Sequence, residues 1–246
     1  MTNLLLCNLT SASFANAALT RCGILECTLE RMDLSGARFE NAMATKADLR
    51  EAAIDGLRID IGVLVDCNLA GRDLTSVELK RANLIKANLA GANLSNVDLT
   101  QALLIGADLR QAGLDGVRAS GAHFMGADLS GASLKGARLD LAVFREAQLV
   151  GADLTGAQLQ TSSFEKADCR GARFDRASLA YAQLPYAHLG GASFVGARFQ
   201  QTDLHGTGAE GTLFMGSSGS THDTDQDRFV AQLYEPARVG RRANGG

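Results

Sequence analysis

The 246-residue sequence contains no tryptophan, only 2 prolines and few aromatic residues, which make up 5% of the chain. So few prolines exclude a proline-rich linker protein, and the 27 scattered glycines exclude collagen. Charge of one sign is not in excess either, because the formal net charge is −3. Such a balance gives no general attraction to nucleic acid or to an anionic membrane. We therefore expect no direct binding of nucleic acid and no membrane association.

Long apolar runs are also absent. The first residues, MTNLLLCNLTSASF, have no basic segment, and their apolar run from Leu4 to Cys7 is too short for a signal peptide. No stretch approaches the ~20 apolar residues that a membrane-spanning helix needs. The five cysteines show neither CxxC pairs nor zinc-finger spacing with histidine. These features predict a cytoplasmic protein without a cofactor or a metal.

The sequence does contain a repeat of five residues. All 43 residues whose numbers end in 4 or 9, from Leu4 to Phe214, are apolar or small, and 27 of these central positions are Leu and 9 are Phe. Two residues before the centre, at the small position, 27 of the 43 residues are Ala. Two residues after the centre, at the corner position, Gly occurs 18 times.

A period of five fits neither an α-helix, which repeats every ~3.6 residues, nor a strand, which alternates every two. It fits a wide coil that turns a corner after each unit. The central and small positions then point inward, and the remaining positions point outward. Glycine at the corner is expected where the turn needs a positive φ.

Units such as Ala87-Asn88-Leu89-Ala90-Gly91 resemble the A-(D/N)-L-X-X motif of the pentapeptide-repeat family over residues 2–216. The resemblance implies an all-β solenoid, a right-handed quadrilateral β-helix with four units per coil and about 11 coils. At ~4.8 Å between strands, the rod would be roughly 50 Å long. We expect residues 217–246 to form a linker, a short helix at about 225–235 and a disordered tail.

In such a coil, residues 20 apart stack into columns along four sides. We name the sides after their first central residues: Face 1 contains Leu4, Face 2 Leu9, Face 3 Phe14 and Face 4 Leu19. Two internal aromatic ladders are expected, formed by Phe124, Phe144 and Phe164 and by Phe174, Phe194 and Phe214. All five cysteines occupy inward positions and are expected to be buried free thiols, with Cys7 and Cys27 as the one pair placed for a disulfide.

Face 1 carries many large apolar residues at its outward positions. These ten residues, the apolar stripe, are Leu5, Leu25, Met43, Val63, Val65, Ile85, Leu103, Ile105, Met125 and Val143. Contiguous exposed apolar surface on a soluble protein commonly marks an interface. Three interpretations stay open: a partner protein or a second copy binds this face, the C-terminal segment folds back over it, or these side chains are partly buried against the turn backbone.

Face 4 is basic, with a formal charge of +3 over residues 2–216. Five arginines directly precede its central positions: Arg38, Arg58, Arg118, Arg138 and Arg198. One interpretation is an acidic or phosphate-bearing partner. The other, which we favour, is a solvated face with weak local ion pairs. The pairs expected there are Arg38 with Glu40, Arg58 with Asp60 and Arg138 with Asp140.

Face 2 has a polar column directly before its central positions. The column reads Asn68, Asn88, Asp108, Asp128, Gln148, Asp168 and His188. Asp and Asn at these places fit hydrogen bonding to nearby turn backbone. Two stacked carboxylates are too few for a hard-cation site, and His188 beside Asp168 has no nucleophile next to it. We therefore expect no catalytic residue, no metal site and no enzyme.

Arg72 stands at a small position, where a charged side chain cannot stay buried and unpaired without a large cost. The sequence predicts a local distortion that lets Arg72 escape, or a buried pairing with Asp73 or Asp55.

After Gly216 the repeat stops. Thr224 is a suitable N-cap for a short helix that Pro236 ends. One face of this helix would carry Phe229, Val230, Leu233 and Tyr234, to cap the last coil or to mediate dimerisation.

Two functions remain. The first is a non-enzymatic protein-protein interaction scaffold whose partner is unknown. The second follows from the resemblance, because some pentapeptide-repeat proteins mimic duplex DNA and bind DNA gyrase or related topoisomerases, which confers resistance to their inhibitors. That mechanism needs an acidic surface, and the balanced charge of this chain weakens it.

Overall fold

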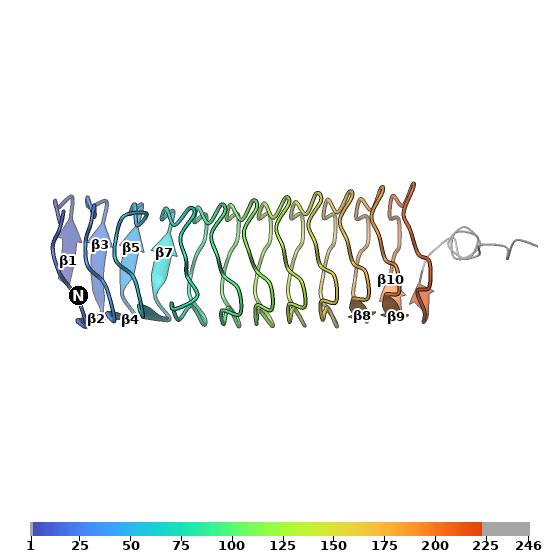
Figure 1. Cartoon of the computed structure of the whole chain (residues 1–246), viewed down its shortest axis with the longest axis horizontal. Helices are drawn as coiled ribbons and strands as arrows, with labels where there is room; N and C mark the ends of the chain where they lie inside the picture. Colours follow the sequence, from blue (N-terminus) through green and yellow to red (C-terminus); the bar gives the residue numbers. More distant parts are fainter. Residues whose placement is uncertain (1, 223–246) are drawn as a thin grey trace, which may run out of the picture.

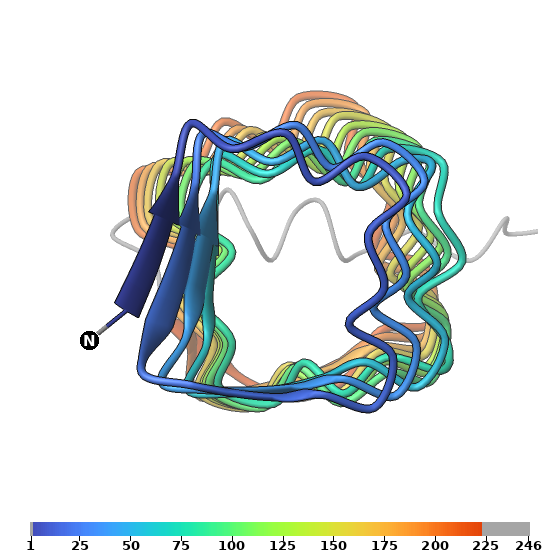
Figure 2. The ribbon, with the colours of Figure 1, turned by 90° about the vertical axis from the view of Figure 1, so that its left-hand side faces the viewer.

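The computed structural model describes residues 2–222, apart from the side chains of Thr2, Asp60 and His222. The chain winds into a straight rod (Figure 1), and each coil has a four-sided outline (Figure 2). This confirms the all-β solenoid. Within the described residues no helix is long and apolar enough to cross a membrane. The helix expected at about 225–235, with its residues Phe229, Val230, Leu233 and Tyr234, lies outside the described residues.

Strands form where two or more consecutive residues of successive coils pair in parallel. They are β1 (Thr2–Leu5), β2 (Ala18–Thr20), β3 (Cys22–Leu25), β4 (Arg38–Glu40), β5 (Met43–Thr45), β6 (Arg58–Asp60), β7 (Val63–Val65), β8 (Ser178–Ala180), β9 (Arg198–Gln200), β10 (Thr202–Asp203) and β11 (Thr221–His222). Their sheets are β1-β3-β5-β7 on Face 1, β2-β4-β6 and β8-β9 on Face 4, and β10-β11. Between residues 68 and 178, single parallel bridges continue the same ladders.

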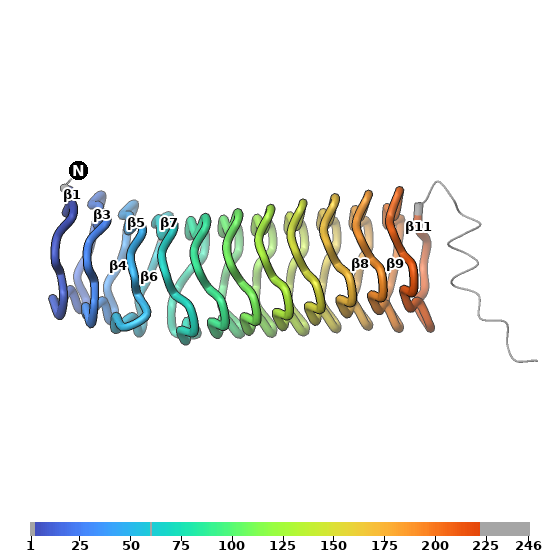
Figure 3. Tube along the Cα trace, turned by 90° about the horizontal axis from the view of Figure 1, so that it is seen from above, coloured from blue at the N-terminus to red at the C-terminus, as the bar shows by residue number. Residues whose placement is uncertain are grey.

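The pairing register is 20 residues from Thr2↔Cys22 to Arg198↔Ser218. Adjacent coils therefore lie side by side along the whole rod (Figure 3). Each coil is held to the next by backbone hydrogen bonds, such as the one from Leu89 N to Asp108 O at 2.7 Å. Neighbour-to-neighbour stacking of this kind is what stabilises a solenoid.

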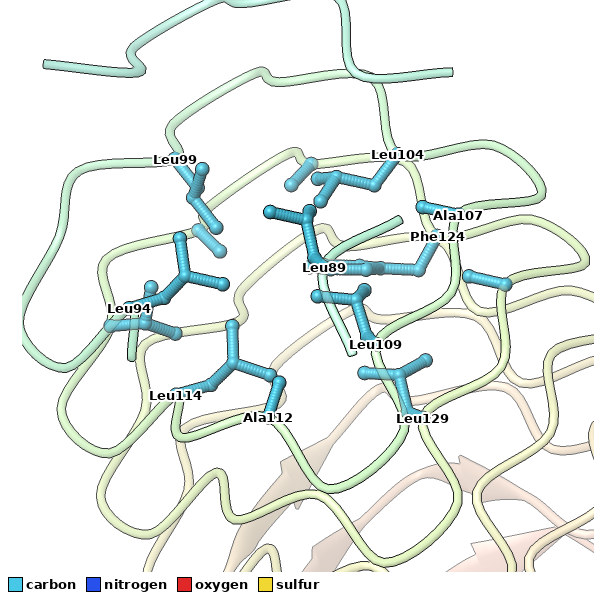
Figure 4. Close-up of a cluster of buried hydrophobic side chains, with 14 of the residues drawn as sticks. Leu89, Leu94, Leu99, Leu104, Ala107, Leu109, Ala112, Leu114, Phe124 and Leu129 are labelled. Atoms are coloured by element: carbon cyan, nitrogen blue, oxygen red, sulfur yellow. The ribbon is translucent and has the colours of Figure 1, made fainter. Parts of the chain in front are cut away.

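Central and small positions form one continuous apolar core. Figure 4 shows leucines of successive coils, among them Leu89, Leu109 and Leu129, stacked as a column inside the rod. The expected phenylalanine ladders are confirmed: Phe124 and Phe144 have ring centroids 4.8 Å apart, and Phe174 and Phe194 are 4.7 Å apart. The two ladders meet edge to face at Phe164 and Phe174.

The cysteines are free thiols, including Cys7 and Cys27. Cys27 Sγ accepts a hydrogen bond from the backbone N of Cys7 at 3.3 Å instead of forming a disulfide. Burial raises the pKa of the Cys67 thiol to about 12 and raises the pKa of Cys169 as well. Such thiols are protonated at neutral pH and are poor nucleophiles.

The corner positions confirm the reason for their glycines and add a finding. From residue 6 to residue 216, every corner residue except Glu51 and Ser76 has a positive φ, whether or not it is glycine. Among them is Ile61, whose φ is 52°. A left-handed conformation costs an L-residue roughly 1–2 kcal/mol. The fold therefore imposes this conformation on many residues that do not favour it.

The expected distortion at Arg72 is present, and Glu51 is part of it. At a regular corner, the backbone N–H of the corner residue donates to a carbonyl of the next coil, that of the residue directly after the centre, as from Leu6 N to Leu25 O. The corresponding bond from Arg31 N to Arg50 O is missing from the described ladder. The Arg50 carbonyl instead accepts a hydrogen bond from Arg72 Nη1 at 2.6 Å. Arg72 is half-buried, and this contact, rather than a buried pair with Asp73 or Asp55, satisfies its guanidinium.

Residues 217–222 correct the expected boundary, because they continue the solenoid instead of forming a linker. Ser218 pairs with Arg198, and β11 pairs with β10 in a register shortened to 19 residues, Thr202↔Thr221. Gly219 makes this change possible with a φ of 109°. A Cβ added there would lie 1.4 Å from the Phe199 carbonyl oxygen, so only glycine fits.

Candidate interaction surfaces

The structure places all ten residues of the apolar stripe on Face 1, as the sequence predicts. The sheet β1-β3-β5-β7 carries the first members, and bridges from Val63 through Asn83, Leu103 and His123 extend the column to Val143. Leu5 and Met125 are exposed, and the other eight are half-buried. The stripe is therefore one continuous, solvent-facing surface within the described residues.

The structure adds apolar corner residues that the sequence analysis did not single out. Five exposed large side chains lie on the two corners that bound Face 1: Leu6, Ile61, Leu141, Tyr181 and Tyr186. Other exposed large apolar residues are Val150 on Face 2 and Val195, Leu213 and Met215 on Face 3. The signal for the corners was in the sequence, since Ile, Leu and Tyr stood at a position that is otherwise occupied by Gly or by polar and charged residues.

Ile61 combines two unfavourable features. It is 51% exposed, and its β-branched side chain sits on a backbone with a positive φ. A β-branched residue rarely adopts this conformation, but here the fold imposes it at nearly every corner, including Thr161. What distinguishes Ile61 is therefore its exposed apolar side chain at the edge of Face 1.

Alternating charges line the other corner of Face 1, in the order Glu26, Lys46, Asp66 and Lys86. Lys46 Nζ lies 2.7 Å from Glu26 Oε1, and this hydrogen bond raises the pKa of Lys46. Neither Asp66 nor Lys86 forms an ion pair within the described part of its own chain. Both are exposed.

The arginines of Face 4 lie where the sequence placed them, but their partners differ from those expected. Arg58 Nε lies 3.3 Å from Glu78 Oε1, and Arg118 Nη2 lies 3.7 Å from Asp98 Oδ2. Both partners belong to a neighbouring coil. The pairs Arg38–Glu40 and Arg138–Asp140 do not form in the described structure, and the side chain of Asp60 is not described. Part of the positive charge is thus neutralised between coils.

Face 2 shows a repeated acidic contact. Asp48, Asp108 and Asp168 each bind the arginine two residues later, with shortest distances of 2.6, 2.5 and 2.6 Å. One oxygen of each carboxylate also accepts the backbone N–H of that arginine. Hydrogen bonds from the arginines lower the pKa of all three carboxyls.

These contacts occupy the groups that could have carried chemistry. Arg110 reaches toward Asp128 as well, with Nε 3.8 Å from Oδ2, so a guanidinium stands by both stacked carboxylates. Asp168, the neighbour of His188, is held by Arg170. Among the described residues, no group of three His, Cys, Asp or Glu side chains is placed to hold a metal ion.

A family model described as Pentapeptide repeats matches the chain in 8 copies. The matched residues are 26–56, 63–101, 92–131, 102–140, 122–160, 142–179 and 172–214. A comparison with curated proteins finds no match.

Three solved structures are also similar to this chain. HetL, a pentapeptide repeat protein involved in heterocyst differentiation regulation in the cyanobacterium Nostoc sp. strain PCC 7120, is 31% identical, with 89% of this chain and 93% of HetL covered and a TM-score of 0.49. A pentapeptide repeat protein from the thylakoid lumen of Arabidopsis thaliana is 28% identical, with 55% and 81% covered and a TM-score of 0.24. QnrB1, a plasmid-mediated fluoroquinolone resistance protein, is 17% identical, with 89% and 99% covered and a TM-score of 0.30.

Proposed function

This chain belongs to the pentapeptide-repeat family, and from that premise we propose that it is a non-enzymatic, cytoplasmic scaffold that binds protein through the outer surface of its rod. The observation that carries the proposal is the apolar stripe with its apolar corners on Face 1. Aliphatic side chains held at regular spacing on a rigid ladder offer a pre-formed surface, so a partner binds without the cost of ordering it.

The charged side chains support a binding role over a catalytic one. The carboxylates of Face 2 are engaged by arginines, and the buried thiols are protonated at neutral pH. A catalytic acid, base or nucleophile must be free to meet its substrate.

The scaffold is tested with two aspartate substitutions in the same repeat slot. Ile105→Asp places a charge in the apolar stripe, whereas Val150→Asp makes a similar change on Face 2. Used as bait in a cell extract, the wild type and Val150→Asp should retain the same proteins, and Ile105→Asp should lose at least one of them. Retention of every protein by Ile105→Asp would show that Face 1 is not the binding surface.

Modulation of DNA gyrase is the second candidate, and the aspartates in the polar column of Face 2 are the feature that favours it. Their carboxylates stack at the spacing of the coils, as in Asp108↔Asp128. Arginine contacts at Asp48, Asp108 and Asp168 reduce the negative potential that mimicry of DNA requires. The test is a supercoiling assay with DNA gyrase, with and without a quinolone. An unchanged assay at micromolar protein removes this candidate.

A further inference from the structure

We propose that Face 1 binds Face 1 of a second copy of this chain, with the two rods antiparallel. This inference rests on the proposed function, since it names the partner of the same surface. The observation behind it is that one register of Face 1 against itself places Val65 opposite Ile85 and, beside them, Asp66 opposite Lys86.

The geometry follows from the parallel ladders. A two-fold axis that lies in the plane of Face 1 and crosses the rod brings each column opposite itself and reverses the order of the coils. We place this axis between the coils of Leu64 and Leu84. Val65 then faces the partner's Ile85, and Met43 faces the partner's Leu103. Successive coils are slightly rotated (Figure 2), so the coils near the axis make the closest contact.

This register also extends the apolar contact away from the axis. Thr45 faces the partner's Ile105, and Leu25 faces the partner's Met125. By symmetry each contact occurs twice, and six of the ten residues of the apolar stripe face apolar residues. At the ends and edges, Leu5 faces the partner's Arg145 and Ile61 faces the partner's Arg81. Removing exposed apolar area from water is the main driving force of such an association.

The charges also fit this register. Asp66 and Lys86, which form no ion pair within the described part of their own chain, meet as Asp66 with the partner's Lys86 and Lys86 with the partner's Asp66. The other charges on this corner meet no like charge, because Lys46 faces the partner's Gly106 and Glu26 faces the partner's Gly126.

An axis between the coils of Leu84 and Leu104 opposes no like charges and pairs Lys46 with the partner's Glu146, but it leaves Asp66 and Lys86 facing glycines of the partner. Three other neighbouring arrangements place like charges together. An axis through the coil of Leu64 itself would set Asp66 against the partner's Asp66 and Lys46 against its Lys86. An axis one coil nearer the N-terminus would set Arg21 against the partner's Arg81. Parallel rods would set Lys86 against Arg81. Like charges directly opposed disfavour these alternatives.

The register is tested by disulfide formation between two introduced cysteines, Met43→Cys and Leu103→Cys, with Cys7 and Cys22 replaced by alanine. Within one chain these positions are three coils, or ~14 Å, apart, which is beyond the reach of a disulfide. Mild oxidation should therefore yield a covalent dimer. The control pair, Met43→Cys with Val143→Cys, should form no covalent dimer. Both pairs are compared on a non-reducing gel. Equal cross-linking of both pairs, or of neither, overturns the register.

Charge reversal gives an independent test. Asp66→Lys sets lysine against lysine at both ends of the central contact, and Lys86→Asp sets aspartate against aspartate. Each variant alone should dimerise about tenfold more weakly than the wild type. An equimolar mixture of the two should recover dimers, because every central pair then carries opposite charges. Light scattering measures the molecular mass of each variant and of the mixture. A mixture that stays monomeric contradicts the proposal.

The outcome also separates this inference from the scaffold function. A wild-type protein that is monomeric at every soluble concentration overturns self-association. If Ile105→Asp still loses a protein from the extract in that case, the scaffold function stands with a different partner. If Ile105→Asp changes neither the oligomeric state nor any captured protein, both fail.

Discussion

At the scale of single residues, the corner is where this fold departs from local preference. Leu6, Ile61 and Leu141 hold positive φ values of 52°, 52° and 61°, although glycine would do so without strain. Ladder bonds between coils, such as those from Leu6 N to Leu25 O and from Leu141 N to Gln160 O, fix the backbone at most corners and outweigh a cost of roughly 1–2 kcal/mol per residue. Among the corner residues from 6 to 216, only Glu51 and Ser76 have no positive φ. Next to Glu51, the Arg50 carbonyl is bound by the guanidinium of Arg72.

We predict that Arg72→Ala stabilises the protein. Alanine suits the small position, and without the guanidinium the Arg50 carbonyl is free to accept the regular bond from Arg31 N. One hydrogen bond then replaces another, and a half-buried charged side chain is removed, so the free energy of unfolding should rise by up to ~1 kcal/mol. Urea denaturation measures the change, and slower amide exchange at Arg31 reports the restored bond. A loss of stability would mean that the Arg72 contact is worth more than the regular ladder.

At the scale of structural elements, ladders of identical side chains replace the packing between layers of a globular core. Phe124, Phe144 and Phe164 stack with nearly parallel rings, at interplanar angles of 2° and 10°. Each ring fills the space above the next, so a smaller residue leaves a void that the rigid coils cannot close.

Phe144→Ala should therefore destabilise the protein by about 3–5 kcal/mol, the cost of removing a buried phenylalanine. Phe144→Leu, which restores the commonest central residue, should cost much less. Chemical denaturation of both variants measures the difference. Similar losses for alanine and leucine would indicate that the ring stacking, rather than the filled volume, is what the site requires.

The Asp–Arg contacts of Face 2 give a dependence on pH. The pKa values of Asp48, Asp108 and Asp168 lie below the usual 3.8 in the folded protein. A carboxyl with a lowered pKa stabilises the fold above its unfolded pKa, and this contribution is lost as the pH falls through the folded value. Unfolding free energy should thus decrease below about pH 4.

The matched variant replaces all three aspartates by asparagine, which keeps the turn hydrogen bond but does not titrate. It should be less stable than the wild type at neutral pH and should lose less stability on acidification. Thermal unfolding over this range measures both. An identical acid response in the two proteins would assign the effect to other carboxyls.

At the scale of the whole molecule, the rod has no single centre, and its stability is a sum over neighbouring coils. Central residues near the middle, such as Leu104 and Phe144, are fully buried, whereas Leu4, Leu9, Phe14 and Leu19 of the first coil are only partly covered. We therefore expect the rod to open from its first coil.

Native-state hydrogen exchange should show this as a gradient. Amides of the first coil should exchange fastest, and protection should rise toward the coils of Phe124 and Phe144, whose opening requires both neighbours to separate. Uniform protection along residues 2–222 would show instead that all coils unfold in one cooperative step.

The sequence by itself determined which side chains face inward, because a five-residue period is compatible with no other regular structure. It therefore predicted the solenoid, the phenylalanine ladders, the four faces and the position of the apolar stripe. It also located the defect at Arg72, since a charge interrupted an otherwise apolar column.

Only the tertiary structure decided what happens between coils and at corners. Arg58 pairs with Glu78 on the next coil, whereas Arg50, Arg110 and Arg170 pair with aspartates two residues earlier on their own coil, and both arrangements are compatible with the spacing of the repeat. The left-handed corners at Leu6 and Leu141 and the closing strand at Thr221–His222 also depend on contacts between coils. At these corners and this strand, hydrogen bonds to residues 19 or 20 positions away override the local preference that a sequence reveals.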